Sequence, residues 1–187
     1  MSAFLFEAIP WGATLLALAA SAVADLRDRI IPNRFSILIA LCGLAVQLRA
    51  GPDHVWIGLL AAMSIFTALG ILAHFGLLGG GDVKLISAAT LLVAPPDIPF
   101  LLAEIALAGG AVSAIYLAAG FILRRRPQLY RAIGKGPAGG FPKWLRREAA
   151  RIAKGFPVPY ALAVLGGIAL HITRELPQCL NAISFSL

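Results

Sequence analysis

Long apolar stretches separated by turn-forming residues make up most of this chain. At about 1.5 Å of rise per helical residue, the first, third and fifth stretches can cross the roughly 30 Å hydrocarbon core of a bilayer. Backbone groups in lipid must satisfy their own hydrogen bonds, which excludes open strands. The pattern therefore predicts an all-α, polytopic membrane protein. The six stretches are Ala3–Ala24, Phe35–Leu48, Val55–Leu78, Leu85–Ala94, Phe100–Leu123 and Val158–Ile172.

The second and fourth stretches are short, and their length alone also fits buried or re-entrant pieces. If both cross the bilayer, the chain has about six transmembrane helices, and Asp25 and Asp82 lie on one membrane face. If neither crosses, the chain has four, and the two aspartates lie on opposite faces. The distribution of charge fits both topologies. In either case we expect a single membrane-embedded domain over residues 1–187.

Composition and charge support this class and add an orientation. Hydrophobic residues make up 59% of the chain and charged residues 13%, whereas a soluble domain has roughly 25% charged residues. Three of the 16 basic residues follow the first stretch, and ten lie between Arg124 and Lys154. The positive-inside rule places both regions in the cytoplasm and the N-terminus outside. No basic residue precedes Arg27, so we expect the first stretch to be a retained helix rather than a cleaved signal peptide.

Two aspartates stand beside apolar stretches, where an ionised carboxylate costs roughly 2.5–3.5 kcal/mol and is often functional. Asp25 ends the first stretch, and Asp82 follows three glycines. Taken singly, each fits an interfacial residue that caps a helix. Two carboxyl groups held close together share a proton, so the ionised one can deprotonate water while the protonated one polarises a peptide carbonyl. The pair therefore suggests peptide hydrolysis without a metal or a covalent intermediate.

The residues around these aspartates resemble a known family. Asp25 with Ile31-Pro32-Asn33, followed by Gly79-Gly80-Gly81-Asp82-Val83-Lys84-Leu85, looks like the first two motifs of the prepilin peptidases, which are bacterial GxGD aspartyl proteases. Residues 155–161 resemble the family's looser third motif. The resemblance implies a six-helix protease of the bacterial inner membrane. Such a protease cuts the leader from type IV pilin precursors near the cytoplasmic face.

The motifs also assign roles by position. Asp28 lies one helical turn beyond Asp25 but lacks the motif's spacing to Ile31, so we expect it to be solvated or ion-paired. The residues carried over from the resemblance are the catalytic pair Asp25 and Asp82, and the supporting residues Gly79, Gly81, Lys84, Pro32 and Asn33.

The resemblance extends to a subclass. Larger prepilin peptidases carry an N-terminal cytoplasmic insertion with paired cysteines, and they also methylate the new pilin N-terminus. This chain enters its first apolar stretch at once, so it resembles the short form linked to Flp-type pili and tight-adherence systems. We therefore expect peptidase activity without N-methyltransferase activity.

The basic stretch 124–154 predicts one further helix. Leu145, Ala149 and Ile152 repeat at helical spacing among arginines, a pattern typical of a helix that lies on an anionic leaflet. Membrane lipids are therefore the expected partner of this stretch, and nucleic acid is not, because short basic loops beside membrane helices serve topology and lipid contact. The histidines are scattered, so we predict no metal site and no cofactor.

Three other functions also fit intramembrane aspartates. A small transporter could use Asp25 and Asp82 to relay protons or bind a cation, but it explains neither motif. A non-catalytic assembly factor with the same fold would tolerate Asp→Asn changes. A preflagellin or pseudopilin peptidase would differ only in its substrate.

Overall fold

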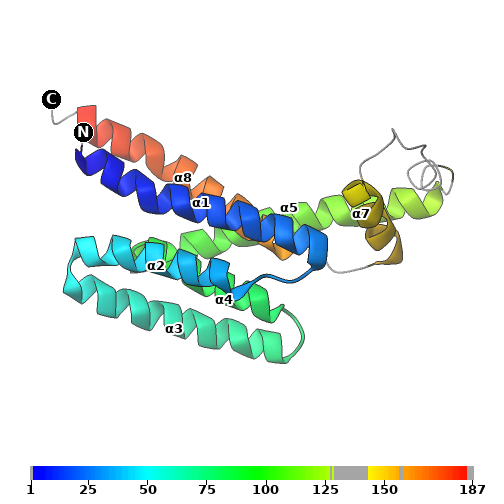
Figure 1. Cartoon of the computed structure of the whole chain (residues 1–187), viewed down its shortest axis with the longest axis horizontal. Helices are drawn as coiled ribbons and strands as arrows, with labels where there is room; N and C mark the ends of the chain where they lie inside the picture. The colour runs from blue at the N-terminus through cyan, green and yellow to red at the C-terminus, as the bar shows by residue number, and fades with distance from the viewer. Residues whose placement is uncertain (1, 127, 129–142, 156–157, 185–187) are drawn as a thin grey trace.

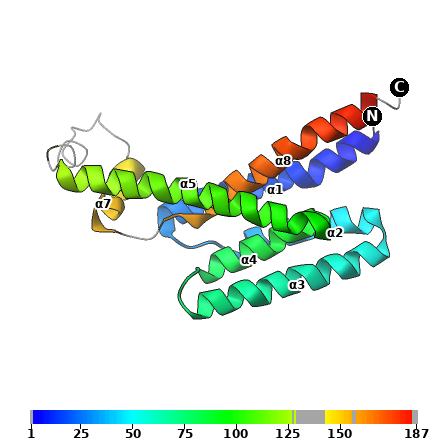
Figure 2. The ribbon, with the colours of Figure 1, turned by 180° about the vertical axis from the view of Figure 1, so that it is seen from behind.

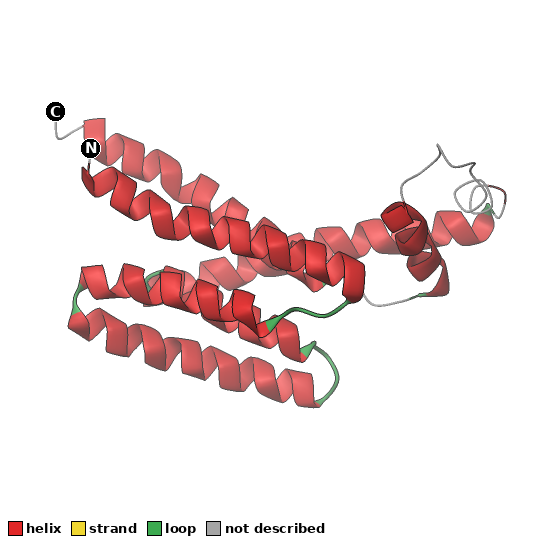
Figure 3. Cartoon of the chain, in the orientation of Figure 1, coloured by secondary structure: helices red, strands yellow, loops and turns green. Residues whose placement is uncertain are grey.

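The computed structural model describes residues 2–126, 128, 143–155 and 158–184 (Figure 1). Its described residues form helices and short connections, with no strand among them (Figure 3). The all-α class predicted from the apolar stretches is therefore confirmed. The helices are α1 (Ser2–Asp28), α2 (Asn33–Ala50), α3 (Pro52–His74), α4 (Gly80–Ala89), α5 (Ile98–Arg125), α7 (Lys143–Lys154) and α8 (Tyr160–Ser184), with the short 3-10 helices η1 (Thr90–Leu92) and η2 (Pro95–Asp97).

Four segments of the described chain are long and apolar enough to cross a bilayer. α8 adds a shorter apolar segment, Tyr160–Arg174. α2 is longer than its apolar stretch, because polar residues at both ends continue the helix. α4 has ten residues and rises only about 15 Å, half the thickness of a hydrocarbon core. The four spans are Ile9–Asp28, Asn33–Ala50, Pro52–His74 and Pro95–Arg125.

Successive helices run up and down, so helix ends that are distant in sequence gather in space. α1 ends, and α2, α4 and α8 begin, at the end of the bundle near α7, here called the α7 end (Figures 1 and 2). Both chain termini lie at the opposite end (Figure 1). Asp25 and Asp82 therefore lie at the same end of the bundle, as the six-helix topology requires and the four-helix topology does not.

The short α4 ends inside the bundle, where its last carbonyl groups need partners. Its residues from Leu85 to Ala89 are buried, and η1 continues it with three more buried residues. The Gln47 side chain of α2 donates hydrogen bonds from Nε2 to the carbonyl oxygens of Leu91 (3.1 Å) and Val93 (3.0 Å). A polar side chain in a span thus satisfies the backbone that a full-length helix would have satisfied itself.

The first half of α5 packs closely against the first half of α8, and a glycine sets their separation. A Cβ atom on Gly167 of α8 would lie 2.5 Å from the Cα of Ile105 on α5. Ile105 and Ile168 are almost fully buried at this contact. A small residue therefore lets the two backbones approach, as is common where helices pack in membranes.

Replacing Gly167 with alanine should destabilise the bundle, because the new methyl group would overlap the backbone of α5. Overpacking of this kind costs about 1–3 kcal/mol, so we expect a lower Tm in detergent, measured by scanning fluorimetry. Gly110→Ala is the matched control, since a Cβ on this helical glycine meets nothing within 4 Å. Equal Tm values for the two variants would contradict the close contact at Gly167.

Candidate active site

Asp25 occupies the last turn of α1, and its side chain is buried, with 7% exposure. Its carboxylate oxygen Oδ2 accepts a hydrogen bond of 3.2 Å from the backbone N–H of Ala161. Ala161 is the second residue of α8, so the carboxylate lies at a helix N-terminus. Unpaired N–H groups and the helix dipole favour negative charge there. The start of α8 therefore stabilises the ionised form of Asp25.

Asp82 lies in the first turn of α4 and is half-buried. Its backbone N–H donates to the carbonyl oxygen of Gly79, 3.0 Å away, which begins the helix directly after the glycines. The two carboxyl groups interact electrostatically, and Tyr160 at the start of α8 also lies within electrostatic range of Asp82. The ends of α1, α4 and α8 thus meet at one pair of carboxyl groups.

The electrostatics of Asp82 favour its protonated form. Asp82 precedes the buried part of α4 and lies outside the four spans. Burial, and after it the charge of Asp25, raises the pKa of Asp82 from 3.8 to about 6, and a hydrogen bond from the Gly79 backbone partly offsets this rise. Burial therefore favours the protonated form of Asp82, whereas the Ala161 N–H is a contact that stabilises the anion of Asp25.

The three glycines before Asp82 are not equivalent. A Cβ on Gly79 would lie 2.8 Å from Oδ2 of Asp82, and a Cβ on Gly81 would lie 3.3 Å from the Cβ of Ile31. A Cβ on Gly80 would meet nothing within 4 Å. The first glycine leaves room for the Asp82 carboxyl group, and the third leaves room for the α1–α2 connection.

The other residues predicted to support the site lie at its rim. Nζ of Lys84 donates a 3.1 Å hydrogen bond to Oδ1 of Asn33, and both residues are exposed. Pro32 is the N-cap residue of α2, with an extended backbone (ψ 134°). The predicted support residues therefore join α4 to the start of α2, and the structure gives no contact between Lys84 and Asp82. Asp28 is exposed at the end of α1.

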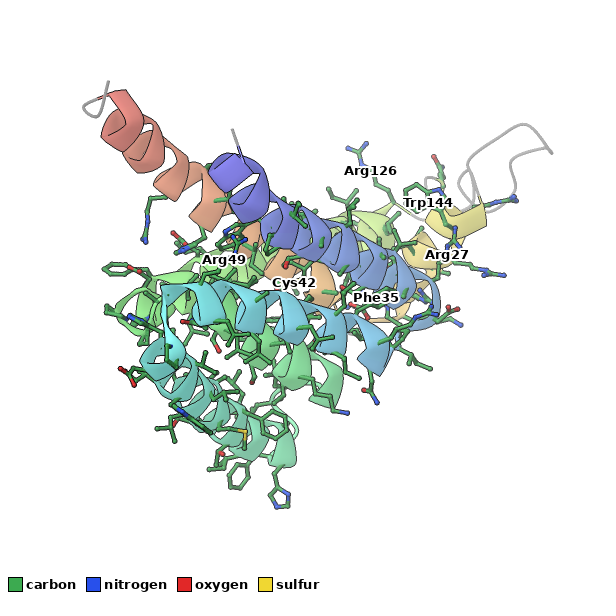
Figure 4. The ribbon with its side chains drawn as sticks, turned by 60° about the vertical axis from the view of Figure 1, so that its left-hand side comes forward. Arg27, Phe35, Cys42, Arg49, Arg126 and Trp144 are labelled. Atoms are coloured by element: carbon green, nitrogen blue, oxygen red, sulfur yellow. The ribbon has the colours of Figure 1, made fainter. Side chains whose placement is uncertain are left out.

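Some sequence features lie partly outside the described residues. The helix predicted in the basic stretch is present as α7, but residues 129–142 and the side chain of Leu145 are outside the described part. Within the third motif, Phe156 and Pro157 are also outside it. Figure 4 shows Trp144 of α7 on the same side of the molecule as Arg27 at the end of α1.

A second group of acidic, histidine and arginine side chains joins α5 to α8 away from the aspartates. At the far end of the bundle, Oε2 of Glu104 on α5 pairs with Nδ1 of His171 on α8 at 2.8 Å, and Oε1 pairs with Nη1 of Arg174 at 3.3 Å. Among the described side chains, no group of three or more His, Cys, Asp or Glu residues could hold a metal ion.

Sequence comparison identifies one matching family. The model of the type IV leader peptidase family matches residues 12–115. This match includes Asp25 and Asp82 and covers more than half of the chain, but it stops before α7 and α8. Searches among curated proteins and among solved structures found no match.

Replacing Gly79 with alanine should displace the Asp82 carboxyl group. The clash involves the end of a flexible side chain, so we expect peptide cleavage to fall about tenfold or more, with little change in Tm. Gly80→Ala has open space around its new methyl group and should keep near wild-type cleavage. Equal cleavage by the two variants, assayed on a pilin precursor in membranes, would contradict the role assigned to Gly79.

Proposed function

The chain belongs to the type IV leader peptidase family, and from this premise we propose that it is an aspartyl endopeptidase with Asp25 and Asp82 as its catalytic pair. Family membership confirms the resemblance to prepilin peptidases and makes the protein a membrane-embedded protease of pilin-type precursors. The aspartic mechanism is our proposal. The observation that carries it is the pairing of a buried carboxylate at the start of α8 with a second carboxyl group in electrostatic range.

The two carboxyl groups would divide the chemistry between them. Asp25, ionised against the Ala161 N–H, removes a proton from water, and the resulting hydroxide attacks the scissile carbonyl carbon. Asp82 gives its proton to the carbonyl oxygen, which produces a neutral tetrahedral intermediate. When the C–N bond breaks, the leaving amine takes the proton now held by Asp25, and the hydroxyl group of the intermediate returns a proton to Asp82. The pair thus ends as it began.

The proposed orientation places the α7 end in the cytoplasm. Arg27, Arg29 and the C-terminal arginines of α5 lie at this end, together with the basic helix α7. The positive-inside rule then places the N-terminus outside a bacterial inner membrane. A single-span pilin precursor with a basic cytoplasmic leader would bring its cleavage site to the level of the aspartates.

The finer assignments rest on the sequence resemblance. We propose that residues 1–187 form a single peptidase domain, that the substrate is an Flp-type pilin precursor, and that the protein has no N-methyltransferase activity. Methyl transfer from S-adenosylmethionine by the purified protein would contradict the last assignment.

Substitution of the aspartates tests the proposal directly. Asp25→Asn and Asp82→Asn each remove a group needed for proton transfer, so we expect each to reduce cleavage of a co-expressed pilin precursor by at least about a hundredfold. Asp28→Asn is the matched control and should cleave normally. Full cleavage by both variants of the pair would contradict the protease mechanism and make solute-flux assays for a transporter the next measurement.

The pH dependence tests the division of roles. If Asp82 acts as the proton donor, its pKa of about 6 means that cleavage should decline above about pH 6, by roughly tenfold per pH unit. Cleavage of a detergent-solubilised precursor between pH 5 and pH 8 would check this. A flat profile over that range would contradict the assignment of Asp82 as the acid.

The same raised pKa predicts a change in stability that does not involve activity. Protonated Asp82 favours the folded state, and this stability is lost as pH rises through about 6. Asp82→Asn, which stays neutral, should therefore raise Tm more at pH 7.5 than at pH 5.

A further inference from the structure

The basic helix α7 contacts the end of α1 directly beyond Asp25. Nη2 of Arg151 donates a 2.7 Å hydrogen bond to the carbonyl oxygen of Arg27, and Nη1 donates to the carbonyl oxygen of Leu26. These carbonyl groups belong to the last turn of α1, where carbonyl groups have no N–H partner within the helix. A cation also interacts favourably with the negative end of a helix. Arg151 therefore caps the helix that carries Asp25.

Arg29, the first residue after α1, is held in an unusual conformation. Its φ angle is +56°, in the left-handed region that costs a non-glycine residue about 1–2 kcal/mol. Its backbone N–H donates to the carbonyl oxygen of Asp25, 3.0 Å away, and its guanidinium group pairs with Glu148 of α7. The turn that ends α1 after Asp25 is therefore anchored to α7.

Glu148 connects these contacts. It is buried, with 6% exposure, on a helix that otherwise carries basic residues. It accepts a 2.7 Å hydrogen bond from the Tyr116 hydroxyl of α5, and it pairs with Arg29 and, at 3.3 Å, with Nη1 of Arg151. One buried carboxylate thus joins α5 and α7 to the turn after Asp25. A helix that only rested on lipid headgroups would have no use for a buried acid at this position.

We propose that Glu148 is a positioning residue for peptide cleavage. It holds Arg29 and Arg151 against the end of α1, which keeps the Asp25 carboxylate on the N-terminus of α8. Arg29, Arg151 and Glu148 all lie within electrostatic range of that carboxylate, so Glu148 also keeps two neighbouring cations paired with itself rather than with Asp25. This inference rests on the proposed catalytic role of Asp25.

The test compares two neighbours on α7. Glu148→Gln removes the charge that holds both arginines, and Arg147→Gln changes an exposed residue beside it. With purified enzyme in detergent and a pilin-precursor peptide, we expect Glu148→Gln to lower kcat about tenfold, the loss of one charged hydrogen bond, with KM unchanged. Arg147→Gln should match wild type. The double variant Arg29→Gln/Glu148→Gln should be no slower than the slower single variant, because both act through one contact.

A purely structural role would give a different result. It would lower Tm and the yield of folded protein, with kcat of the folded enzyme within about twofold of wild type, and that result would overturn the proposal. If Glu148→Gln does not fold, the variant Tyr116→Phe tests the positioning role instead. This variant removes one hydrogen bond to Glu148, and we expect kcat to fall about threefold at unchanged KM. An unchanged kcat in Tyr116→Phe would also overturn the proposal.

The aspartate variants separate this inference from the proposed function. Cleavage by Asp25→Asn and Asp82→Asn would contradict the proposed function itself, whatever the Glu148 variants do. Inactive aspartate variants together with normal kcat in Glu148→Gln and Tyr116→Phe would overturn the positioning role alone.

Discussion

Two carboxyl groups held near one another inside an apolar protein are the constraint on which the α7 end of this bundle depends. Desolvation and mutual repulsion both oppose their ionisation. The fold treats the two carboxyl groups differently. Asp25 receives a backbone N–H at the start of α8, which favours the anion, whereas Asp82 has only the Gly79 backbone to offset its burial and the charge of Asp25. The two groups differ because Asp25 accepts a hydrogen bond at the N-terminus of α8, whereas Asp82 lies in the first turn of its own helix, α4.

This difference between the two carboxyl groups requires the ends of three helices, distant in sequence, to meet beside them. α1 and α4 contribute the carboxyl groups, but α8, which follows them by many residues, contributes the N–H group. The short α4 fits this plan, because Asp82 can begin a helix that stops within the bundle only if its last carbonyl groups find other partners. η1 continues α4, and Gln47 donates to the carbonyl oxygens of Leu91 in η1 and of Val93 directly after it. A polar side chain in the last turn of α2 thus supports the short α4–η1 segment that begins near Asp82.

Much of this architecture could be predicted from the sequence, because long apolar segments and glycine or proline breaks are local signals. The helices and the presence of a helix in the basic stretch followed from such signals. The apolar pattern and the charges left open whether Asp25 and Asp82 share a membrane face, and only the resemblance to prepilin peptidases favoured the six-helix topology. Contacts between distant side chains had no local signal. The partners of Glu148, Gln47 and Glu104 lie far away in the sequence, so no local pattern indicates them. The third motif pointed to residues 155–161 but not to the backbone N–H of Ala161 as the contact.

Buried and half-buried acids in the described part of the chain also differ in how their charge is compensated. Glu104 is paired with His171 and Arg174, and Glu148 with Arg29 and Arg151. Asp25 is as deeply buried as Glu148, yet the two nearby guanidinium groups are bound to Glu148 and to the carbonyl oxygens of α1. A carboxylate with a full ion pair is a weak base, since the cation stabilises the charge that must be given up. In the proposed mechanism, Glu148 occupies the arginines, so that Asp25 keeps the hydrogen bond from the Ala161 N–H rather than a full ion pair and stays basic enough to accept a proton from water.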